Sequence, residues 1–210
     1  MKVLKFGGTS VGSPKSIREV ANIVRNIKGK KTVVLSAMSG TTNDLHDLAS
    51  LIINYKEEQA NDVVDVLIGR YVDVVNELLL EQANQKEAIG LVSEVFEYIR
   101  SHIGAEIKSS QIEKNIVAQG EVLSTNLFHF HLKEVGASAL LVSAFDFMAI
   151  DDADEPVIEK ITKAYGAIVD QNKDNEIFIT QGYVCLSNKG EIDNLKRGGS
   201  DYSASLIGAA

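Results

Sequence analysis

A chain of 210 residues is long enough for one α/β domain with a large core, or for two small domains. Its apolar content of 45% and charged content of 24% are ordinary for a soluble globular protein. A net charge of −8 without any basic stretch argues against general affinity for nucleic acid. A single cysteine, Cys185, excludes an internal disulfide framework, and no run approaches the ~20 apolar residues of a membrane span, so we expect a cytoplasmic protein that binds no membrane.

The first residues of the chain predict a strand, a glycine turn and the start of a helix. The apolar run that begins at Val3 contains Lys5 near its end, and Ser13 followed by Pro14 is a typical helix start. The turn between them consists of glycines and hydroxyl residues: Gly7, Gly8, Thr9 and Ser10. Backbone N–H groups, a helix dipole and a fixed positive charge therefore converge at one point, as the binding of a phosphate chain requires.

This turn differs from two better-known nucleotide-binding motifs. The spacing of Gly7 and Gly12 matches a P-loop, but Ser13 and Pro14 stand where that motif has a lysine and a hydroxyl residue. The dinucleotide fingerprint is also absent, because Gly7 and Gly8 are adjacent. A glycine turn that binds no ligand remains the alternative.

The next segments predict a βαβ unit followed by a long helical region. Apolar residues recur at helical spacing over residues 15–28, Gly29 ends that helix, and residues 32–35 form a continuous apolar run typical of a buried parallel strand. Residues 44–133 carry almost no strand signal and no proline. We expect several helices there, with a helical insertion at about residues 60–133 on one side of the sheet.

Strand signals return in the last third of the chain. Residues 138–142 and 176–180 predict strands, and residues 156–167 between them predict a helix. Residues 188–190 indicate a hairpin turn between two short β-type runs, and a last helix is predicted from about Tyr202. This order of elements is that of an α/β sandwich with a mostly parallel sheet.

The chain ends inside a helical pattern. Ser200 or Asp201 can cap this helix, whose apolar face includes Leu206 and Ile207. Because a glycine turn into a helix normally leads to another strand in this fold class, the chain looks cut in mid-fold. We expect an open sheet edge and an exposed apolar helix face, both of which favour self-association.

Four turns rich in glycine or hydroxyl residues lie at predicted strand ends: residues 7–10, 36–43, 181–182 and 197–201. Since ligands bind outside the carboxyl ends of the strands in open α/β sheets, we expect one pocket at that edge. For residues 36–43 the alternative is simple helix capping by Thr42 or Asn43.

Two charged residues beside glycines are further candidates for ligand binding. Gly120, within a helix, costs ~1 kcal/mol relative to alanine and usually permits close approach of another segment. If Glu121 beside it is buried, it needs a cationic partner; otherwise it is a surface residue of an amphipathic helix. Arg197 before two glycines can grip a carboxylate with two hydrogen bonds or merely point to solvent.

The remaining polar residues indicate no metal site. His129 and His131 are two residues apart on a predicted helix and point in different directions. His46 and His102 have no cysteine or carboxylate cluster around them. The acidic run at residues 151–155 is most simply a solvated loop.

Five segments carry distinctive motifs in a fixed order along the whole chain. They are residues 5–11 (KFGGTSV), 36–37 with 42–43, 120–121, 179–182 (ITQG) and 197–202 (RGGSDY). Together they resemble the aspartokinase branch of the amino acid kinase family. The resemblance implies a three-layer αβα sandwich with a mostly parallel central sheet. It also implies that residues 1–210 are the N-terminal portion of the catalytic domain, without the nucleotide-binding remainder and the regulatory ACT domains.

The resemblance implies a kinase that uses ATP and Mg²⁺ to phosphorylate the β-carboxylate of L-aspartate, as the first step of lysine, threonine and methionine biosynthesis. By the same resemblance, Lys5 holds the transferring phosphate, while Asp201 orients that lysine and assists Mg²⁺. The implied phosphate-binding residues are Lys5, Gly7, Gly8, Thr9, Ser10 and Ser36. The implied aspartate-binding residues are Thr42, Glu121, Arg197, Gly199 and Ser200. Among them, Glu121 would bind the α-ammonium group and Arg197 a carboxylate.

The implied chemistry needs no general base. The accepting β-carboxylate has an unperturbed pKa near ~3.9 and is ionised at neutral pH, so the site must offset the repulsion between two anions. We expect Mg²⁺ to be held mainly through the ATP phosphates, the intact enzyme to be a homo-oligomer, and the isolated 210 residues to be inactive. A non-catalytic amino-acid-binding or assembly module that retains the fold is the alternative.

Overall fold

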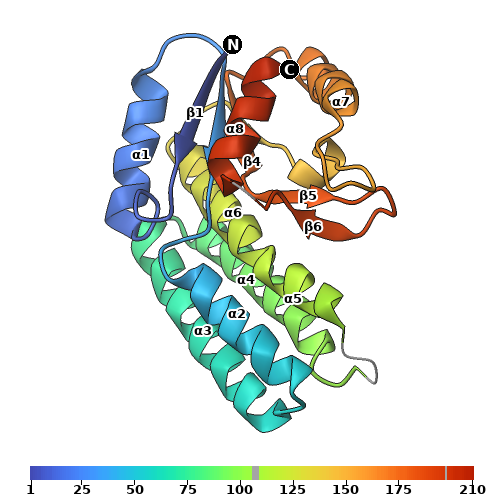
Figure 1. The fold of residues 1–210 in the computed structure, drawn as a ribbon. Coiled ribbons are helices and arrows are strands. Elements are labelled where there is room, and N and C mark those ends of the chain that lie inside the picture. Colours follow the sequence, from blue (N-terminus) through green and yellow to red (C-terminus); the bar gives the residue numbers. More distant parts are fainter. Residues whose placement is uncertain (106–108, 197) are drawn as a thin grey trace.

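A parallel sheet lies at the centre of the computed structural model, shown in Figure 1. The described residues are 1–105, 109–196 and 198–210. Among them, four parallel strands are arranged in the order β1-β2-β4-β3. Their bounds are Lys2–Phe6 for β1, Lys31–Leu35 for β2, Ala139–Leu141 for β3 and Ile177–Gln181 for β4. Phe6, Leu35 and Gln181 are in register, so β1, β2 and β4 end together at one edge of the sheet.

Helices cover both faces of this sheet, which confirms the three-layer αβα sandwich. The covering helices are α1 (Pro14–Asn26), α6 (Gln119–Glu134), α7 (Ile158–Gln171) and α8 (Gly199–Ala209). Val33 and Leu35 pack with α1 and α6, whereas Val34 and Phe178 pack with α7 and α8. Because successive strand residues point to opposite faces and both faces are covered, residues 33–35 of β2 and 177–179 of β4 are continuously apolar rather than alternating.

The predicted helical region consists largely of a bundle at one end of the sheet. Its helices are α2 (Thr41–Ile53), α3 (Glu57–Leu78), α4 (Gln82–Ser101) and α5 (Ser110–Val117). In Figure 1 they extend away from the sheet, and α6 joins them to it, because α6 contacts β2, β3 and β4 as well as α2, α4 and α5. The expected insertion at residues 60–133 therefore includes a helix that belongs to the sandwich itself. Among the described residues, no helix is both long and apolar enough to cross a membrane.

Local sequence signals explain the boundaries of α1. Ser13 is its N-cap, and the Ser13 hydroxyl accepts a hydrogen bond from the Ser16 N–H, as the Ser-Pro pattern predicts. The helix ends at Asn26, and Gly29 lies three residues later in the turn to β2, with φ +82°. Gly29 thus supplies the left-handed turn before the strand rather than the end of the helix itself.

The hairpin predicted around residues 188–190 is present. It pairs β5 (Val184–Leu186) with β6 (Ile192–Asn194) in antiparallel fashion, as a separate two-stranded sheet. Gly190 lies in the turn with φ +75°, a conformation that glycine adopts without steric cost. The turn residues therefore predict this element correctly from a few neighbouring positions.

Helix α7 begins at Ile158 rather than at Pro156, where the sequence predicts it. Pro156 instead forms an antiparallel bridge with Ile150, after the short 3₁₀ helix η1 (Ala144–Asp146). This bridge and the hydrogen bond from the Val157 N–H to Ala149 O hold residues 156 and 157 beside residues 149 and 150, so the helix starts two residues later.

Helix α8 differs from the prediction at its start and on its apolar face. Gly198, with φ +77°, occupies the N-cap position, so neither Ser200 nor Asp201 caps the helix. Leu206 and Ile207 are only 5% and 3% exposed, in the core between α8 and the sheet. The expected exposed apolar face is therefore wrong, because α8 packs against β1 and β2.

Candidate functional site

The carboxyl edge of the sheet brings together turns that are far apart in the sequence. The loop after β1 contacts the loop after β2, where the Ser39 N–H donates to Gly8 O at 3.1 Å. The loop after β2 is in turn close to the end of β4, where the Gly182 N–H donates to Leu35 O at 2.9 Å. The beginning of α8 lies against Gly182. These contacts place the described parts of all four predicted turns at one edge.

The Lys5 ammonium group lies at this edge beside Asp201. Lys5 Nζ, from β1, is 3.0 Å from Asp201 Oδ1 in the first turn of α8. The two side chains are 26% and 76% exposed, so the pair can reach a ligand from solvent. A Cβ built on Gly7 would lie 3.5 Å from Nζ, so the ammonium group sits over the glycine turn. A cation, an open backbone and a helix N-terminus meet there, which is an arrangement suited to phosphate.

The glycines of the first loop also have a packing role. A Cβ on Gly8 would lie 2.8 Å from Ala37 O, and one on Gly12 would lie 3.0 Å from Ser39 Cβ. A side chain at either position would therefore separate the loops after β1 and β2. The Ser10 N–H donates to Gly7 O at 2.9 Å, so at Ser10 the hydroxyl group, rather than the amide, is left for a ligand.

Ser36 and Ser200 join the loop after β2 to helix α8. The Ser36 hydroxyl donates to Ser200 Oγ at 2.8 Å. Ser200 is buried, and its side chain occupies the space where a Cβ on Gly182 would be, 2.4 Å away. The absence of a side chain at Gly182 thus allows α8 to dock, which brings Gly199 and Asp201 to the same edge.

Glu121 is a buried carboxylate beneath the loop after β2. Its side chain is 3% exposed, and its Oε1 accepts a hydrogen bond from the Ala37 N–H at 3.2 Å. A Cβ on Gly120 would lie 2.9 Å from Ala37 Cβ, so this glycine does permit the close approach that the sequence suggests. The alternative of a surface glutamate is wrong, because α6 runs underneath the site loops instead of facing solvent.

The second oxygen of Glu121 is the unusual feature of the site. Oε2 is buried and has no hydrogen-bond partner, and no ion pair involves Glu121 among the described residues. Burial raises the pKa of Glu121 to about 7, while the Ala37 N–H bond partly opposes the rise. Such a buried acceptor without a partner is suited to bind a cationic group.

Thr42 lies near the same edge, in the first turn of α2. It is half-buried, and the N-cap position of α2 is Gly40, with φ +86° and no side-chain hydrogen bond. The alternative that Thr42 or Asn43 only caps this helix is therefore wrong. The neighbouring Thr41 has a structural contact instead, because its hydroxyl shares a hydrogen bond with Tyr71 OH at 2.9 Å.

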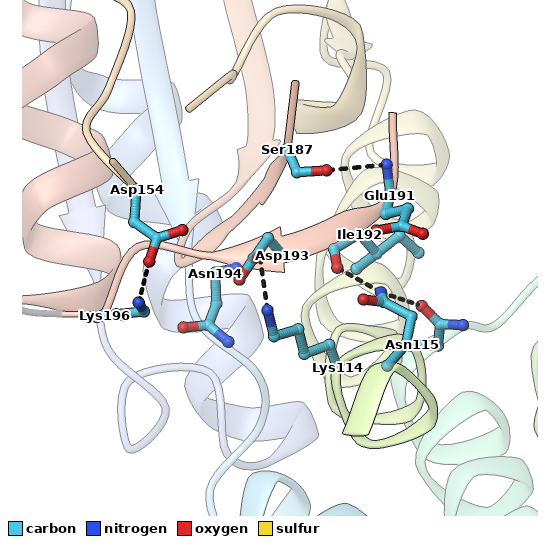
Figure 2. A network of polar contacts seen from close by, with 10 residues as sticks. Lys114, Asn115, Asp154, Ser187, Glu191, Ile192, Asp193, Asn194 and Lys196 are labelled. Carbon is cyan, nitrogen blue, oxygen red and sulfur yellow. Dashed lines mark hydrogen bonds and ion pairs between the residues drawn. The ribbon is translucent and has the colours of Figure 1, made fainter. Parts of the chain in front are cut away.

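Arg197 lies outside the described residues, so its predicted role has no geometry here. The segment that precedes it is held by a polar network, which Figure 2 shows. Lys114 Nζ of α5 is 2.6 Å from Asp193 Oδ2 of β6, and Lys196 pairs with Asp154. The acidic run that contains Asp154 is an exposed loop, as predicted. Strand β6 is thereby fastened to the helical bundle, and the segment after it is fastened to this loop.

Tyr183 is a site residue to which the sequence reasoning assigned no role. It adopts φ +69°, which is uncommon outside glycine, and its N–H donates to Ser203 Oγ at 2.8 Å. A Cβ on Gly199 would lie 3.6 Å from its ring, and burial, followed by the charge of Glu121, raises the pKa of Tyr183. Strained backbone of this kind often marks functional sites, but no local sequence signal predicts it at a tyrosine.

Metal ligands do not gather in the described part of the chain. No group of three histidine, cysteine, aspartate or glutamate side chains there could hold a metal ion. His46, for example, pairs with Glu113 at 2.8 Å between α2 and α5. Cys185 is buried and unpaired.

The fold and this edge define an αβα protein whose candidate ligand site combines a lysine over a glycine turn with a buried carboxylate. The chain belongs to the amino acid kinase family, which it matches over residues 1–210. The fold class expected from the five motifs is confirmed by this match and by the solved structures of similar shape.

The similar proteins are aspartokinases. The aspartokinase of Chlamydia muridarum is 28% identical over 98% of this chain and 44% of its own length. The structure of Escherichia coli aspartokinase III with lysine and aspartate superposes with a TM-score of 0.82, at 28% identity over 99% of this chain and 46% of that one. The same enzyme with aspartate and ADP gives 0.81, at the same identity and coverage. The chain spans less than half the length of these relatives.

Proposed function

We propose that this chain is the N-terminal portion of the catalytic domain of an aspartate kinase, which transfers the γ-phosphoryl group of ATP to the β-carboxylate of L-aspartate. The observation that carries the proposal is the Lys5–Asp201 pair over the glycine turn, on the same edge as the buried, unpartnered oxygen of Glu121. One group is suited to a phosphate and the other to an ammonium group. The similarity to aspartokinases, one of them solved with aspartate and ADP, supports the same assignment.

Lys5 would act on the phosphoryl group. Its ammonium group, together with the N–H groups of Gly7 and Gly8, would offset the negative charge that builds up as the phosphoryl group is transferred. Asp201 would hold Lys5 in this position through the 3.0 Å ion pair. The residues proposed to complete the phosphate contacts are Thr9, Ser10 and Ser36.

Glu121 would select an amino acid. Its unpartnered Oε2 would accept a hydrogen bond from the α-ammonium group, and the ligand's charge would then stabilise the ionised carboxylate. The further residues proposed to contact aspartate are Thr42, Arg197, Gly199 and Ser200. Because the accepting β-carboxylate is already ionised at neutral pH, no residue of the chain needs to remove a proton from it.

Mg²⁺ would reach the site on the ATP phosphates. The described residues contain no trio of metal-ligating side chains, whereas the Asp201 carboxylate is exposed beside Lys5 and can contact a phosphate-bound ion. Bound there, Mg²⁺ would neutralise phosphate charge. ATP and L-aspartate are thus the proposed substrates, and the intact protein is proposed to be a cytoplasmic homo-oligomer that catalyses the first step of lysine, threonine and methionine biosynthesis.

The test is acyl-phosphate formation by the full-length protein. Hydroxylamine traps an acyl phosphate as a hydroxamate, so L-aspartate with ATP and Mg²⁺ should yield aspartyl hydroxamate. Glutamate and succinate serve as matched controls, and both should yield little. Equilibrium binding of aspartate without hydroxamate would instead favour a non-catalytic amino-acid-binding module. Loss of both activities would overturn the proposal.

The 210 residues alone are proposed to lack turnover. These residues contact ATP through Lys5 and the glycine turn, which bind the phosphates but not the adenine base. Calorimetric titration with Mg²⁺-ATP should therefore show much weaker binding to the isolated chain than to the full-length protein. Near-normal turnover by the isolated chain would contradict this proposal.

A further inference from the structure

Gln181 ends strand β4 at the ligand edge, and both polar atoms of its side-chain amide make hydrogen bonds within the protein. The residue is 3% exposed and stands in register with Leu35 of β2. Its Oε1 accepts from the Ala144 N–H at 2.8 Å, and its Nε2 donates to Thr125 Oγ1 at 2.7 Å. Because a backbone N–H can only donate, Oε1 must face Ala144, and the amide has one possible orientation.

Thr125 continues this path to Glu121. Thr125 is fully buried on α6, and its hydroxyl donates to the backbone carbonyl of Glu121 at 2.8 Å, one helical turn earlier. The Glu121 carboxylate then accepts from the Ala37 N–H in the loop after β2. Four consecutive hydrogen bonds therefore run from Ala144, after β3, through Gln181 at the end of β4 and through α6, to Ala37, after β2.

We propose that Gln181 is a positioning residue. It fixes the position of α6 along the sheet, so that the unpartnered oxygen of Glu121 can accept a hydrogen bond from the ligand's ammonium group. This inference rests on the proposed function of Glu121 as the ammonium-binding residue. Apolar packing alone lets a helix slide along a sheet by small amounts, whereas the two hydrogen bonds of this buried amide are directional. The contact at Gly120, where a Cβ would come within 2.9 Å of Ala37, leaves little room for such a shift.

A purely structural role makes a different prediction. If Gln181 only satisfies two buried polar groups, its loss lowers stability and leaves the ligand preference unchanged. If it positions Glu121, its loss changes aspartate recognition more than ATP recognition. It also lets water reach the carboxylate, so the raised pKa of Glu121 falls toward its ordinary value.

The test compares Gln181→Met with two matched controls in the full-length protein. Methionine has a similar shape but can make neither hydrogen bond. Thr180→Val changes the preceding residue of β4, and Ser124→Ala changes the residue before Thr125 on α6. The hydroxyl oxygens of Thr180 and Ser124 are buried without a hydrogen-bond partner, so both controls disturb the same elements without breaking the path.

Kinetics give the first readout. Gln181→Met should raise the KM for aspartate roughly 10- to 100-fold and change the KM for ATP by less than about twofold, because a small misplacement is felt only at the misplaced group. The two controls should behave as the wild type. Thr125→Val removes the other end of the bond, so the effects of the two variants should be strongly non-additive in the double variant. Equal changes in both KM values, or full additivity, would overturn the proposal.

The pH dependence of unfolding gives a readout that needs no kinase activity. The raised pKa of Glu121 contributes a loss of stability as pH rises toward 7, whereas His129 and His131 on the same helix, whose pKa values are lowered mainly by burial, contribute a gain. Gln181→Met should reduce the decline due to Glu121, and the two controls should keep the pH profile of the wild type. Tyr71 and Tyr183, the other titratable groups whose charge couples to Glu121, have raised pKa values and stay neutral over this range. An unchanged decline would refute the positioning role. Absence of aspartate phosphorylation in the wild type would refute only the proposed function.

Discussion

Replacing Glu121 with glutamine should stabilise the protein at neutral and alkaline pH. Burial raises the pKa of Glu121 from 4.5 to about 7. At about 1.4 kcal/mol per unit, ionising this buried group costs on the order of 3 kcal/mol of stability, as an upper figure. Glutamine keeps an acceptor for the Ala37 N–H and carries no charge, so Glu121→Gln avoids this cost.

The sign follows from proton linkage. Between pH 4.5 and about 7 the folded state keeps the Glu121 proton that the unfolded state has already lost. The contribution of Glu121 to wild-type stability therefore falls as pH rises through this window, and the loss is complete above the folded pKa. Burial lowers the pKa values of His129 and His131, whose contributions change in the opposite sense and are common to both proteins, so the difference between wild type and variant isolates Glu121. Glu121→Gln should match the wild type near the lower end of the window and exceed it by up to about 3 kcal/mol at the upper end.

Urea denaturation at about pH 5 and about pH 8 measures this difference, since unfolding free energies extrapolate linearly with denaturant. Glu159→Gln on α7, an exposed glutamate, is the matched control and should show the same difference from the wild type at both pH values. If Glu121→Gln also differs from the wild type by the same amount at both, the carboxylate is not destabilised by burial. The account of its open oxygen would then be refuted.

Three further predictions concern the site. Lys5→Ala should lower turnover by roughly 10²-fold or more while aspartate binding is retained, and Lys2→Ala on the same strand should leave turnover unchanged. A loss of turnover below about threefold in Lys5→Ala would contradict the phosphate role. Glu121→Gln should weaken aspartate binding several-fold to a hundredfold, on the order of 1–3 kcal/mol, but should hardly change the binding of succinate, which lacks the ammonium group. If calorimetry shows equal losses of affinity for aspartate and succinate, the ammonium group binds elsewhere. Gly182→Ala should destabilise the protein by about 1–3 kcal/mol in the same urea assay, because the new Cβ would lie 2.4 Å from a side-chain atom of α8. Gly166→Ala in α7 is the control: a Cβ there meets nothing within 4 Å, so this variant should be stabilised by up to ~1 kcal/mol.

The sequence alone determined the elements whose signals are local. Ser13 and Pro14 start α1, the continuous apolar run of β2 predicts a strand covered on both faces, and Gly190 marks the hairpin turn. Each of these signals depends on residues within about one helical turn or one strand pair. The order of the elements then limits the fold to a parallel αβα sandwich, and it also predicts that the turns meet at the carboxyl edge.

Tertiary structure alone decided how the residues at that edge are used. Helical spacing cannot say whether Glu121 faces water or lies under a loop, because the loop that covers it is formed more than 80 residues earlier in the chain, at Ala37. The same holds for Leu206 and Ile207, whose burial depends on β1 and β2. Burial, unpaired polar atoms and pKa shifts arise from contacts between segments distant in sequence, so they become visible only once the chain is folded.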